Sequence, residues 1–218
     1  MKHLHGTYFI GGIDTDAGKT VATGYLAARI AQAGGRVITH KPVQTGCTDV
    51  ADDILRHRAI MGCGLLAEDR DKLTMPQMFP YPCSPHLAAE LAGRAIDFAA
   101  IDHSLAVLQQ RYDTVLVEGA GGLLVPLRED YLQIDWVREK QWPVILVSSG
   151  KLGSINHTLL SLEALRHRGI PLAGVAYNPF FRSQDETIHQ NTHAYLQGYL
   201  KRHFPQAAWW DIPCLPNV

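Results

Sequence analysis

Short runs of consecutive apolar residues alternate along the chain with longer stretches in which apolar residues recur every three or four positions. The short runs predict strands at residues 8–10, 36–40, 114–117, 144–147 and 172–177. The longer stretches predict helices at residues 21–33, 52–61, 87–91, 101–110, 131–140, 154–168 and 186–203. Strands that alternate with helices of this kind are typical of an α/β fold.

The predicted strands are apolar at consecutive positions rather than at alternate ones, as in Val115-Leu116-Val117 and Val144-Ile145-Leu146-Val147. Because strands of this type are buried on both faces, we expect a mostly parallel sheet with helices on both sides. In such sheets, ligands bind beyond the carboxyl ends of the strands. Polar or glycine-rich segments follow the predicted strands at residues 14–20, 41–46, 118–122, 151–156 and 178. The pattern therefore predicts one shared site.

Composition narrows the class of protein. The 218 residues are 46% hydrophobic, which is enough for one compact domain spanning residues 1–218. The formal net charge of -1 argues against a nucleic-acid partner. No apolar run approaches the roughly 18 residues of a membrane span, and the first residues lack the apolar stretch of a secretory signal. The four cysteines form no Cys-x-x-Cys pair, so we expect free thiols in a reducing cytoplasm.

The segment between the first predicted strand and helix reads Gly12-Ile13-Asp14-Thr15-Asp16-Ala17-Gly18-Lys19-Thr20. Backbone N–H groups at such a turn and helix start bind phosphate, and Gly18 lets the backbone approach closely. Lys19 would reach the β- and γ-phosphates of a nucleotide, and Thr20 would offer a hydroxyl to Mg²⁺. Gly12 and Gly18 enclose one residue more than the usual pattern. We therefore predict nucleoside triphosphate binding by a variant phosphate loop.

Charged side chains near the other strand ends extend this chemistry. Glu118 closes an apolar strand and precedes a run of glycines, as the second metal contact of P-loop enzymes does. Lys41 fits two interpretations equally: a charged strand end before a proline turn, or a group that stabilises charge in phosphoryl transfer. Asp53 lies in the first turn of a predicted helix, where an acidic residue is common for dipole reasons alone. Asp14 and Asp16 would repel phosphate, which is mild support for a cationic ligand nearby.

Several other residues have ordinary structural interpretations. Gly153 and Ser154 read as a helix N-cap, although a helix start can also bind a carboxylate. His57 follows Asp53 by four residues on one helix face, and the chain has eleven histidines in all. No third ligand completes a metal pattern with them, so we interpret them as solvated or structural. This includes the pair His189 and His193. We expect Trp209-Trp210 to pack on the sheet edge.

Five segments, in order along nearly the whole chain, resemble those of the dethiobiotin synthetases, the ATP-dependent carboxylases of biotin synthesis. Gly12-x-Asp14-Thr15-x-x-Gly18-Lys19-Thr20 is similar to the lengthened phosphate loop of that family. The other four segments are Lys41-Pro42-Val43 with Thr45-Gly46, Ser84-Pro85-His86-Leu87-Ala88-Ala89, Val117-Glu118-Gly119-Ala120-Gly121-Gly122, and Lys151-Leu152-Gly153 with Ile155-Asn156-His157.

The resemblance implies a P-loop fold and a homodimer that acts on 7,8-diaminopelargonate, CO₂ and ATP with Mg²⁺. CO₂ would add to one amine of the substrate to give a carbamate. ATP would phosphorylate the carbamate oxygen, and the neighbouring amine would close the ureido ring and expel phosphate. The product would be dethiobiotin.

The resemblance also implies roles for individual residues. Lys19 and Lys41 would be catalytic, the first by holding the phosphates and the second by holding the carbamate. Mg²⁺ would be bound by Thr20, Asp53 and Glu118. The nucleotide would contact Asp16, Ala17, Gly18, Lys19, Thr20, Val21, Asp53, Glu118, Gly119, Ala120, Gly121, Asn178, Pro179, Pro213, Cys214 and Leu215, with Asn178 at the base. The substrate would contact Thr45 and, from the other subunit, Gly153, Ser154 and Asn156.

Two rival classes share the fold. A ParA/MinD-type ATPase switch has an extra lysine near the start of its phosphate loop, whereas this loop carries Ile13, Asp14 and Asp16 there. A ligase of the cobyrinate amidase type normally needs a glutaminase domain, for which 218 residues leave no room. The sequence therefore favours the dethiobiotin synthetase interpretation.

Overall fold

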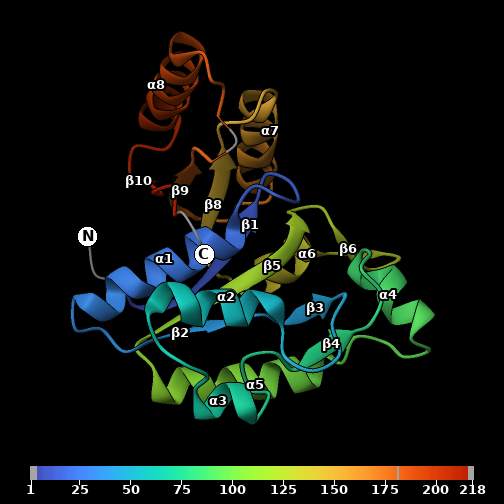
Figure 1. The fold of residues 1–218 in the computed structure, drawn as a ribbon. Coiled ribbons are helices and arrows are strands. Elements are labelled where there is room, and N and C mark those ends of the chain that lie inside the picture. The colour runs from blue at the N-terminus through green and yellow to red at the C-terminus, as the bar shows by residue number, and fades with distance from the viewer. Residues whose placement is uncertain (1–3, 181, 216–218) are drawn as a thin grey trace.

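A six-stranded sheet forms the centre of the computed structural model, which describes residues 4–180 and 182–215. All of its paired strands are parallel, in the order β10-β9-β8-β1-β5-β2 (Figure 1). In chain order the strands are β1 (Gly6–Gly12), β2 (Val37–His40), β5 (Thr114–Gly122), β8 (Val144–Ser149), β9 (Leu172–Asn178) and β10 (Ala208–Asp211). This order places β1, which leads into the phosphate loop, between β8 and β5.

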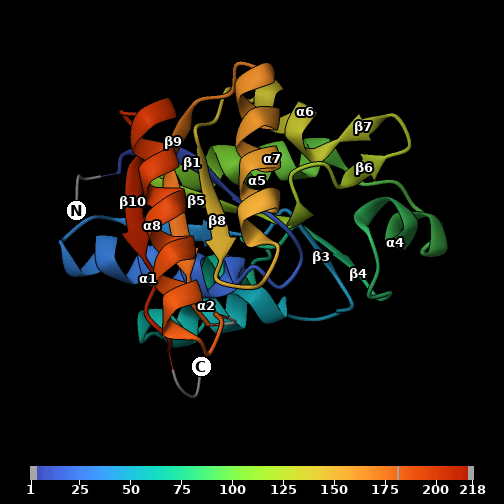
Figure 2. The ribbon, with the colours of Figure 1, turned by 90° about the horizontal axis from the view of Figure 1, so that it is seen from above.

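Helices cover both faces of the sheet, as the sequence predicts. Helix α1 packs on one face with α2 beside it, and α5, α6, α7 and α8 lie on the other (Figures 1 and 2). Their bounds, with those of two short helices, are α1 (Lys19–Gln32), α2 (Asp52–Met61), α3 (Ala67–Arg70), α4 (Pro85–Leu91), α5 (Phe98–Arg111), α6 (Gln133–Glu139), α7 (Ser154–His167) and α8 (Glu186–His203). The predicted α/β class is confirmed.

Two small sheets flank the carboxyl end of the main one. Strands β3 (Val43–Thr45) and β4 (Gln77–Phe79) pair in parallel, and β6 (Pro126–Arg128) and β7 (Tyr131–Leu132) pair antiparallel. The guanidinium of Arg94 lies 4.2 Å from the ring centre of Phe79, the last residue of β4, in a cation–π contact. These strands were not predicted, because runs of two or three residues are too short to show a period.

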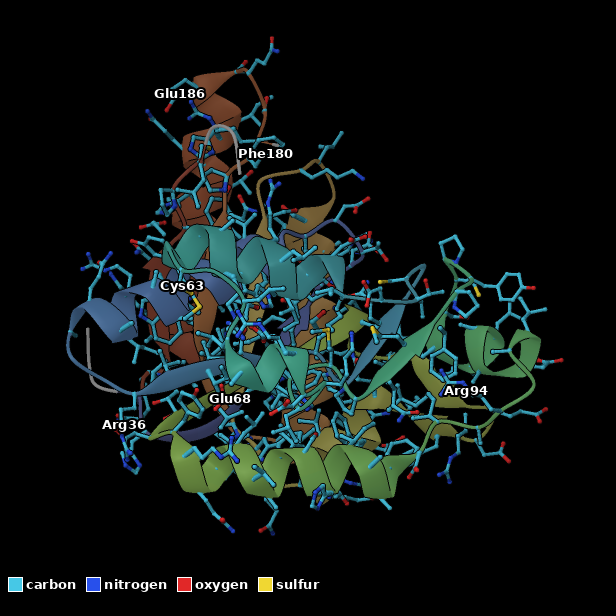
Figure 3. The ribbon with its side chains drawn as sticks, turned by 60° about the horizontal axis from the view of Figure 1, so that its bottom comes forward. Arg36, Cys63, Glu68, Arg94, Phe180 and Glu186 are labelled. Atoms are coloured by element: carbon cyan, nitrogen blue, oxygen red, sulfur yellow. The ribbon has the colours of Figure 1, made fainter. Side chains whose placement is uncertain are left out.

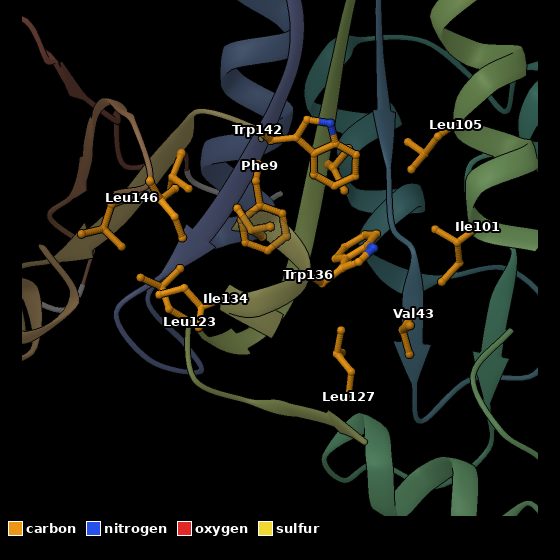
Figure 4. Packing of buried hydrophobic residues seen from close by; sticks show 14 of the residues in the cluster. Phe9, Val43, Ile101, Leu105, Leu123, Leu127, Ile134, Trp136, Trp142 and Leu146 are labelled. Atoms are coloured by element: carbon orange, nitrogen blue, oxygen red, sulfur yellow. The ribbon is translucent and has the colours of Figure 1, made fainter. Parts of the chain in front are cut away.

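Two apolar clusters hold the layers together. The cluster on the α1 face joins Ile10 and Leu116 of the sheet to Leu26 of α1. The larger cluster on the opposite face includes Phe9 and Trp136, whose rings meet edge to face at 6.4 Å (Figure 4). Since neighbouring residues Phe9 and Ile10 point to opposite clusters, β1 is buried on both faces, as its apolar sequence predicts.

The structure corrects three details of the predicted elements. Glu118 does not end its strand, because β5 continues to pair with β1 as far as Gly122. Residues 131–132 are extended rather than helical, so α6 begins only at Gln133. Trp209 and Trp210 do not pack on the sheet edge; they belong to β10, which pairs with β9 and is itself the edge.

Candidate active site

The loop that joins β1 to α1 brings the backbone of Gly18 close to the end of β9. Gly18 has a φ of 88°, a left-handed conformation that favours glycine. A Cβ atom at this position would lie 1.8 Å from Nδ2 of Asn178. A larger residue at position 18 would therefore strain the loop and force the amide of Asn178 to move, at a helix start whose free N–H groups favour an anion.

The side chain of Lys19 folds back over this loop. Its Nζ donates to the carbonyl oxygen of Asp14 at 3.0 Å, and the residue is buried. Gly12 leaves the necessary space, because a Cβ atom there would lie 2.9 Å from Nζ of Lys19. The ammonium group thus lies on the inner side of the loop, where the sequence predicts the phosphates.

Three oxygen-bearing side chains meet at the start of α1. The hydroxyl of Thr20 donates to Oδ1 of Asp53 at 2.7 Å and is 3.1 Å from Oε1 of Glu118. Asp53 lies in the first turn of α2, and Glu118 lies inside β5. The structure therefore brings together the three predicted metal ligands from three separate segments.

Lys41 follows β2 and reaches the same carboxylates. Its Nζ is 2.6 Å from Oδ2 of Asp53 and 3.1 Å from Oε1 of Glu118. It also donates to the carbonyl oxygen of Gly119 at 3.1 Å. Lys41 is buried, so the ammonium neutralises the two acids within the protein rather than in solvent.

Burial and neighbouring charges shift the pKa values of this cluster. Burial lowers the pKa of Lys19 to about 8, and repulsion by Lys41 acts in the same direction. Burial would also lower the pKa of Lys41, but the carboxylates of Glu118 and Asp53 outweigh it and raise that pKa. Burial would raise the pKa of Glu118, but the charges of Lys41 and Lys19 and the hydrogen bond from His57 together outweigh it and hold the pKa well below its usual range. Lys41 and Glu118 are therefore both charged near neutral pH.

The donor set suits Mg²⁺ rather than a metal caged by protein alone. In the described part of the chain, no three His, Cys, Asp or Glu side chains form a group that could hold a metal ion. Mg²⁺ is usually held by one or two carboxylates together with phosphate oxygens and water. Two carboxylates and a hydroxyl beside a phosphate loop match that requirement.

A cavity of about 710 Å³ opens beside this cluster, within the range of small-molecule sites. The predicted site residues that line it are Asp16, Gly18, Lys19, Thr20, Val21, Lys41, Thr45, Asp53, Glu118, Ala120, Gly121, Asn178, Pro213, Cys214 and Leu215. Asn178 and residues 213–215, to which the family resemblance assigns the nucleotide base, line this same cavity. The amide oxygen Oδ1 of Asn178 accepts from the N–H of Phe180, which fixes the amide group.

Six predicted site residues lie outside this cavity lining. Ala17, Gly119 and Pro179 adjoin lining residues in the chain. Ser154, at the start of α7, lines a second cavity of about 700 Å³ on the other side of the phosphate loop. Gly153 directly precedes Ser154 in the chain, and Asn156 follows it by two residues. Thr15, Asp16 and Phe180 line both cavities, and Figure 3 shows Phe180 in the segment that leads to α8.

Two buried residues beside the site were not recognised from the sequence. His57, interpreted as solvated or structural, is fully buried with Nε2 2.8 Å from Oε2 of Glu118. The sequence feature that could have pointed to His57 is its spacing of four residues from Asp53, which places both on one face of α2. Gln133, at the start of α6, accepts from the N–H of Ala120 at 2.8 Å and donates to the carbonyl oxygen of Gly122 at 3.1 Å. No local pattern marks a lone glutamine of this kind.

Comparisons with known proteins agree with this geometry. A family model described as an AAA domain matches residues 6–203. The chain is 50% identical over 198 residues to the ATP-dependent dethiobiotin synthetase BioD 2 of Pasteurella multocida, covering 91% of this chain and 92% of that protein. It is 52% identical over 204 residues to the ATP-dependent dethiobiotin synthetase BioD of Chlorobaculum tepidum, covering 93% and 85%.

Solved structures that resemble this chain are less than 20% identical to it, so they support its fold but not its function. The signal recognition particle receptor FtsY of Elizabethkingia anophelis superposes with a TM-score of 0.52 at 13% identity, covering 99% of this chain and 61% of that one. The kinase domain of the Escherichia coli tyrosine kinase ETK gives the same TM-score at 19% identity, covering 82% and 69%.

The parallel sheet and the phosphate loop at the start of α1 define a P-loop nucleotide-binding protein. Within that class, relatives at 50% identity over nine-tenths of the chain settle the family. The chain belongs to the dethiobiotin synthetase family. Among residues 4–180 and 182–215, no helix is both long and apolar enough to span a bilayer.

Proposed function

We propose that the protein is an ATP-dependent dethiobiotin synthetase, a cyclo-ligase of biotin biosynthesis. It joins 7,8-diaminopelargonate to CO₂ at the expense of ATP and yields dethiobiotin, ADP and phosphate. Membership of the family supports this reaction. One structural observation carries it: two lysines, a hydroxyl and two carboxylates meet in a single cavity. These are Lys19, Lys41, Thr20, Asp53 and Glu118.

The reaction has three bond-forming steps. An amine nitrogen attacks CO₂ and loses a proton to give a carbamate. A carbamate oxygen then attacks the γ-phosphorus of ATP, and ADP leaves. Finally, the second amine attacks the carbonyl carbon of the mixed anhydride, loses a proton and expels phosphate, which closes the ring.

The phosphate loop would position ATP for the second step. Lys19 and the N–H groups at the start of α1 would hold the phosphates, because phosphoryl transfer depends mainly on positioning and charge stabilisation. Mg²⁺, held by Thr20, Asp53 and Glu118, would supply neutralisation of the charge on the phosphate oxygens. The short contacts among these three side chains support that assignment.

Lys41 would hold the carbamate. In the ligand-free protein its ammonium neutralises Asp53 and Glu118. With a divalent cation held by Asp53 and Glu118, the ammonium of Lys41 would be free to contact a carbamate oxygen in the cavity that it lines. Thr45, which lines the same cavity on β3, would donate a hydroxyl contact to the substrate.

The substrate carboxylate would be held by Gly153, Ser154 and Asn156 of the other subunit of a homodimer. Two observations support this part of the proposal. None of these three residues lines the nucleotide cavity of its own chain. The hydroxyl of Ser154 is buried and has no hydrogen-bond partner among the described residues.

We further propose one domain over residues 1–218 in a cytoplasmic enzyme, in keeping with four free cysteines.

A direct test is the release of phosphate from ATP, Mg²⁺ and bicarbonate, with and without the diamine. We expect release to depend on the diamine and dethiobiotin to form in equal amount. Omission of Mg²⁺ should abolish both. A ParA/MinD-type switch would hydrolyse ATP regardless of the diamine, and that result would exclude the proposed reaction.

The dimer has its own test. Sedimentation of the active enzyme at assay concentration should give a dimer. Mixing Ser154→Ala chains with Lys19→Ala chains should restore activity in hybrid dimers, because one of the two sites then has both intact halves. A fully active monomer would contradict the shared site.

A further inference from the structure

The two carboxylate oxygens of Glu118 face different partners. Oε1 is 3.1 Å from both the hydroxyl of Thr20 and the ammonium of Lys41, on the side of the nucleotide cavity. Oε2 lies 2.8 Å from Nε2 of His57, on the side away from it. Because an ionised carboxylate only accepts hydrogen bonds, His57 is the donor. The contact fixes the rotation of the carboxylate about its last bond.

The other ring nitrogen of His57 is held by a second contact, on the side away from Glu118. This nitrogen, Nδ1, lies 3.0 Å from the hydroxyl oxygen of Thr39. The same hydroxyl oxygen accepts a hydrogen bond from Nη1 of Arg58 at 2.9 Å. His57 and Thr39 have no exposed surface, and Arg58 is 2% exposed. The ring therefore cannot turn without leaving polar atoms buried and unpaired, which is costly.

Arg58 anchors this chain of contacts to the rest of the fold. Its Nε and Nη2 donate to the two oxygens of Asp69, each at 2.8 Å. Asp69 also accepts from the hydroxyl of Thr74 at 2.7 Å, and the carbonyl oxygen of Thr74 accepts from the N–H of Lys41 at 2.7 Å. One buried hydrogen-bond network, which runs through His57, Thr39, Arg58, Asp69 and Thr74, thus holds both Glu118 and the backbone of Lys41 in place.

We propose that His57 is a positioning residue, which holds Glu118 with Oε1 turned toward Thr20 and Lys41 and so sets the affinity of the site for the divalent cation. The inference rests on the Mg²⁺ site of the proposed function. His57 is buried behind Glu118 and acts through it, not on the substrate. Since Asp53 precedes His57 by one helical turn, α2 presents one carboxylate itself and orients the other.

The test measures cation binding rather than turnover. The probe is Mn²⁺, which shares the preference of Mg²⁺ for carboxylate and water oxygens. Its affinity for the full chain is followed by electron paramagnetic resonance with a non-hydrolysable ATP analogue present. We expect His57→Phe, which keeps a ring but no donor, to bind Mn²⁺ about 10- to 100-fold more weakly than the wild type. His57→Gln keeps a donor and should recover most of that loss.

His40 offers a matched control. It is another fully buried histidine, and its Nε2 is 3.0 Å from the hydroxyl of Ser104 on α5. Its side chain lies on the opposite face of β2 from Thr39. We expect His40→Phe and His40→Gln to leave the Mn²⁺ affinity unchanged, whatever they do to the melting temperature.

Three results would decide the matter. Unchanged Mn²⁺ affinity in a folded His57→Phe variant would overturn this inference while leaving the proposed function intact. Failure of the wild type to bind Mn²⁺ with nucleotide would overturn both. If His57→Phe does not fold, Thr39→Val takes its place, because it keeps the ring and removes its support. Thr39→Val should then weaken Mn²⁺ binding and Thr39→Ser restore it, and equal affinities would count against the inference.

Discussion

The ammonium nitrogen of Lys41 lies 2.6 Å from Oδ2 of Asp53, in a place where the two side chains are 6% and 22% exposed. The contact links the end of β2 to the first turn of α2. It also joins the residue that would hold the carbamate to one that would hold the cation. The charge balance of the ligand-free site therefore depends on Lys41.

We expect Lys41→Met to destabilise the ligand-free protein by about 3–5 kcal/mol, because Asp53 and Glu118 would lose the buried ammonium that contacts both of them. Saturating Mg²⁺ should return part of this loss by taking over the neutralisation. Urea unfolding with and without Mg²⁺ measures both effects. Lys140→Met, at a surface pair with Asp102, is the control and should cost no more than about 1 kcal/mol.

The same substitution separates binding from chemistry. Lys41→Met should still bind nucleotide, since Lys19 and the phosphate loop are intact, but should no longer form dethiobiotin. Loss of nucleotide binding equal to that of Lys19→Met would show that Lys41 serves the phosphates instead.

Gly18→Ala should weaken both nucleotide binding and stability. Its φ of 88° costs a residue with a Cβ atom about 1–2 kcal/mol, and that atom would lie 1.8 Å from Nδ2 of Asn178. Gly34→Ala is the control for backbone strain alone, because Gly34 has a φ of 84° and nothing within 4 Å of the added atom. We expect Gly18→Ala to be clearly the worse in chemical denaturation, and Gly34→Ala to bind nucleotide normally.

A second variant isolates the steric part of that effect. Asn178→Ala removes the clashing amide but also the hydrogen bond from the N–H of Phe180, so the double variant is compared with Asn178→Ala alone. Adding Gly18→Ala to Asn178→Ala should then cost only about as much as Gly34→Ala. A cost equal to that of Gly18→Ala in the wild type would place the effect in the loop itself.

The sequence was most informative where function depends on adjacent residues. Gly18, Lys19 and Thr20 are consecutive, so a local pattern predicts the phosphate loop. Asp53 was distinguished from an ordinary first-turn carboxylate only by the family resemblance, because its partners lie in other segments. Those partners, Thr20 and Lys41, are supplied by the fold.

His57 shows where local reasoning ends. Its partners Thr39 and Glu118 are 18 and 61 residues away in the chain, so nothing nearby distinguishes a buried, bonded histidine from a solvated one. Strand β10 was missed for a related reason. Its four residues include two tryptophans, and only pairing with β9 makes them a strand.

Acid should destabilise the protein partly through Asp69. Burial would raise the pKa of Asp69, but the hydrogen bonds and charge of Arg58, together with the hydrogen bonds from Thr74 and Leu66, outweigh it and lower the pKa below its ordinary value. A carboxylate with a lowered pKa contributes stability above its unfolded pKa of about 3.9 and loses it as the pH falls through the folded pKa. Unfolding free energies between pH 6 and pH 3 should therefore fall less steeply below about pH 4 in Asp69→Asn than in the wild type.

Asp113 provides the comparison for that pH series. It pairs with Arg36 at the surface, where the side chains are 37% and 66% exposed, and its pKa is lowered mainly by the hydrogen bond from Arg36. Solvent screens such a pair, so Asp113→Asn should leave the acid slope almost unchanged. Equal slopes for Asp69→Asn and the wild type would mean that Asp69 contributes no more than this surface pair.

Gln133 should control the rate through the end of β5 that follows Glu118. Its amide oxygen accepts from Ala120 and its amide nitrogen donates to Gly122, so one side chain holds the backbone whose Gly119 carbonyl contacts Lys41. Gln133→Leu leaves a donor and an acceptor without partners, at a cost of about 1–3 kcal/mol. We expect a lower kcat with little change in the KM for ATP, because the phosphate loop is untouched.

Gln109→Leu, which removes only an exposed contact with Thr7, should keep the wild-type kcat. If Gln133→Leu also keeps it while losing stability, Gln133 supports the fold and not the reaction.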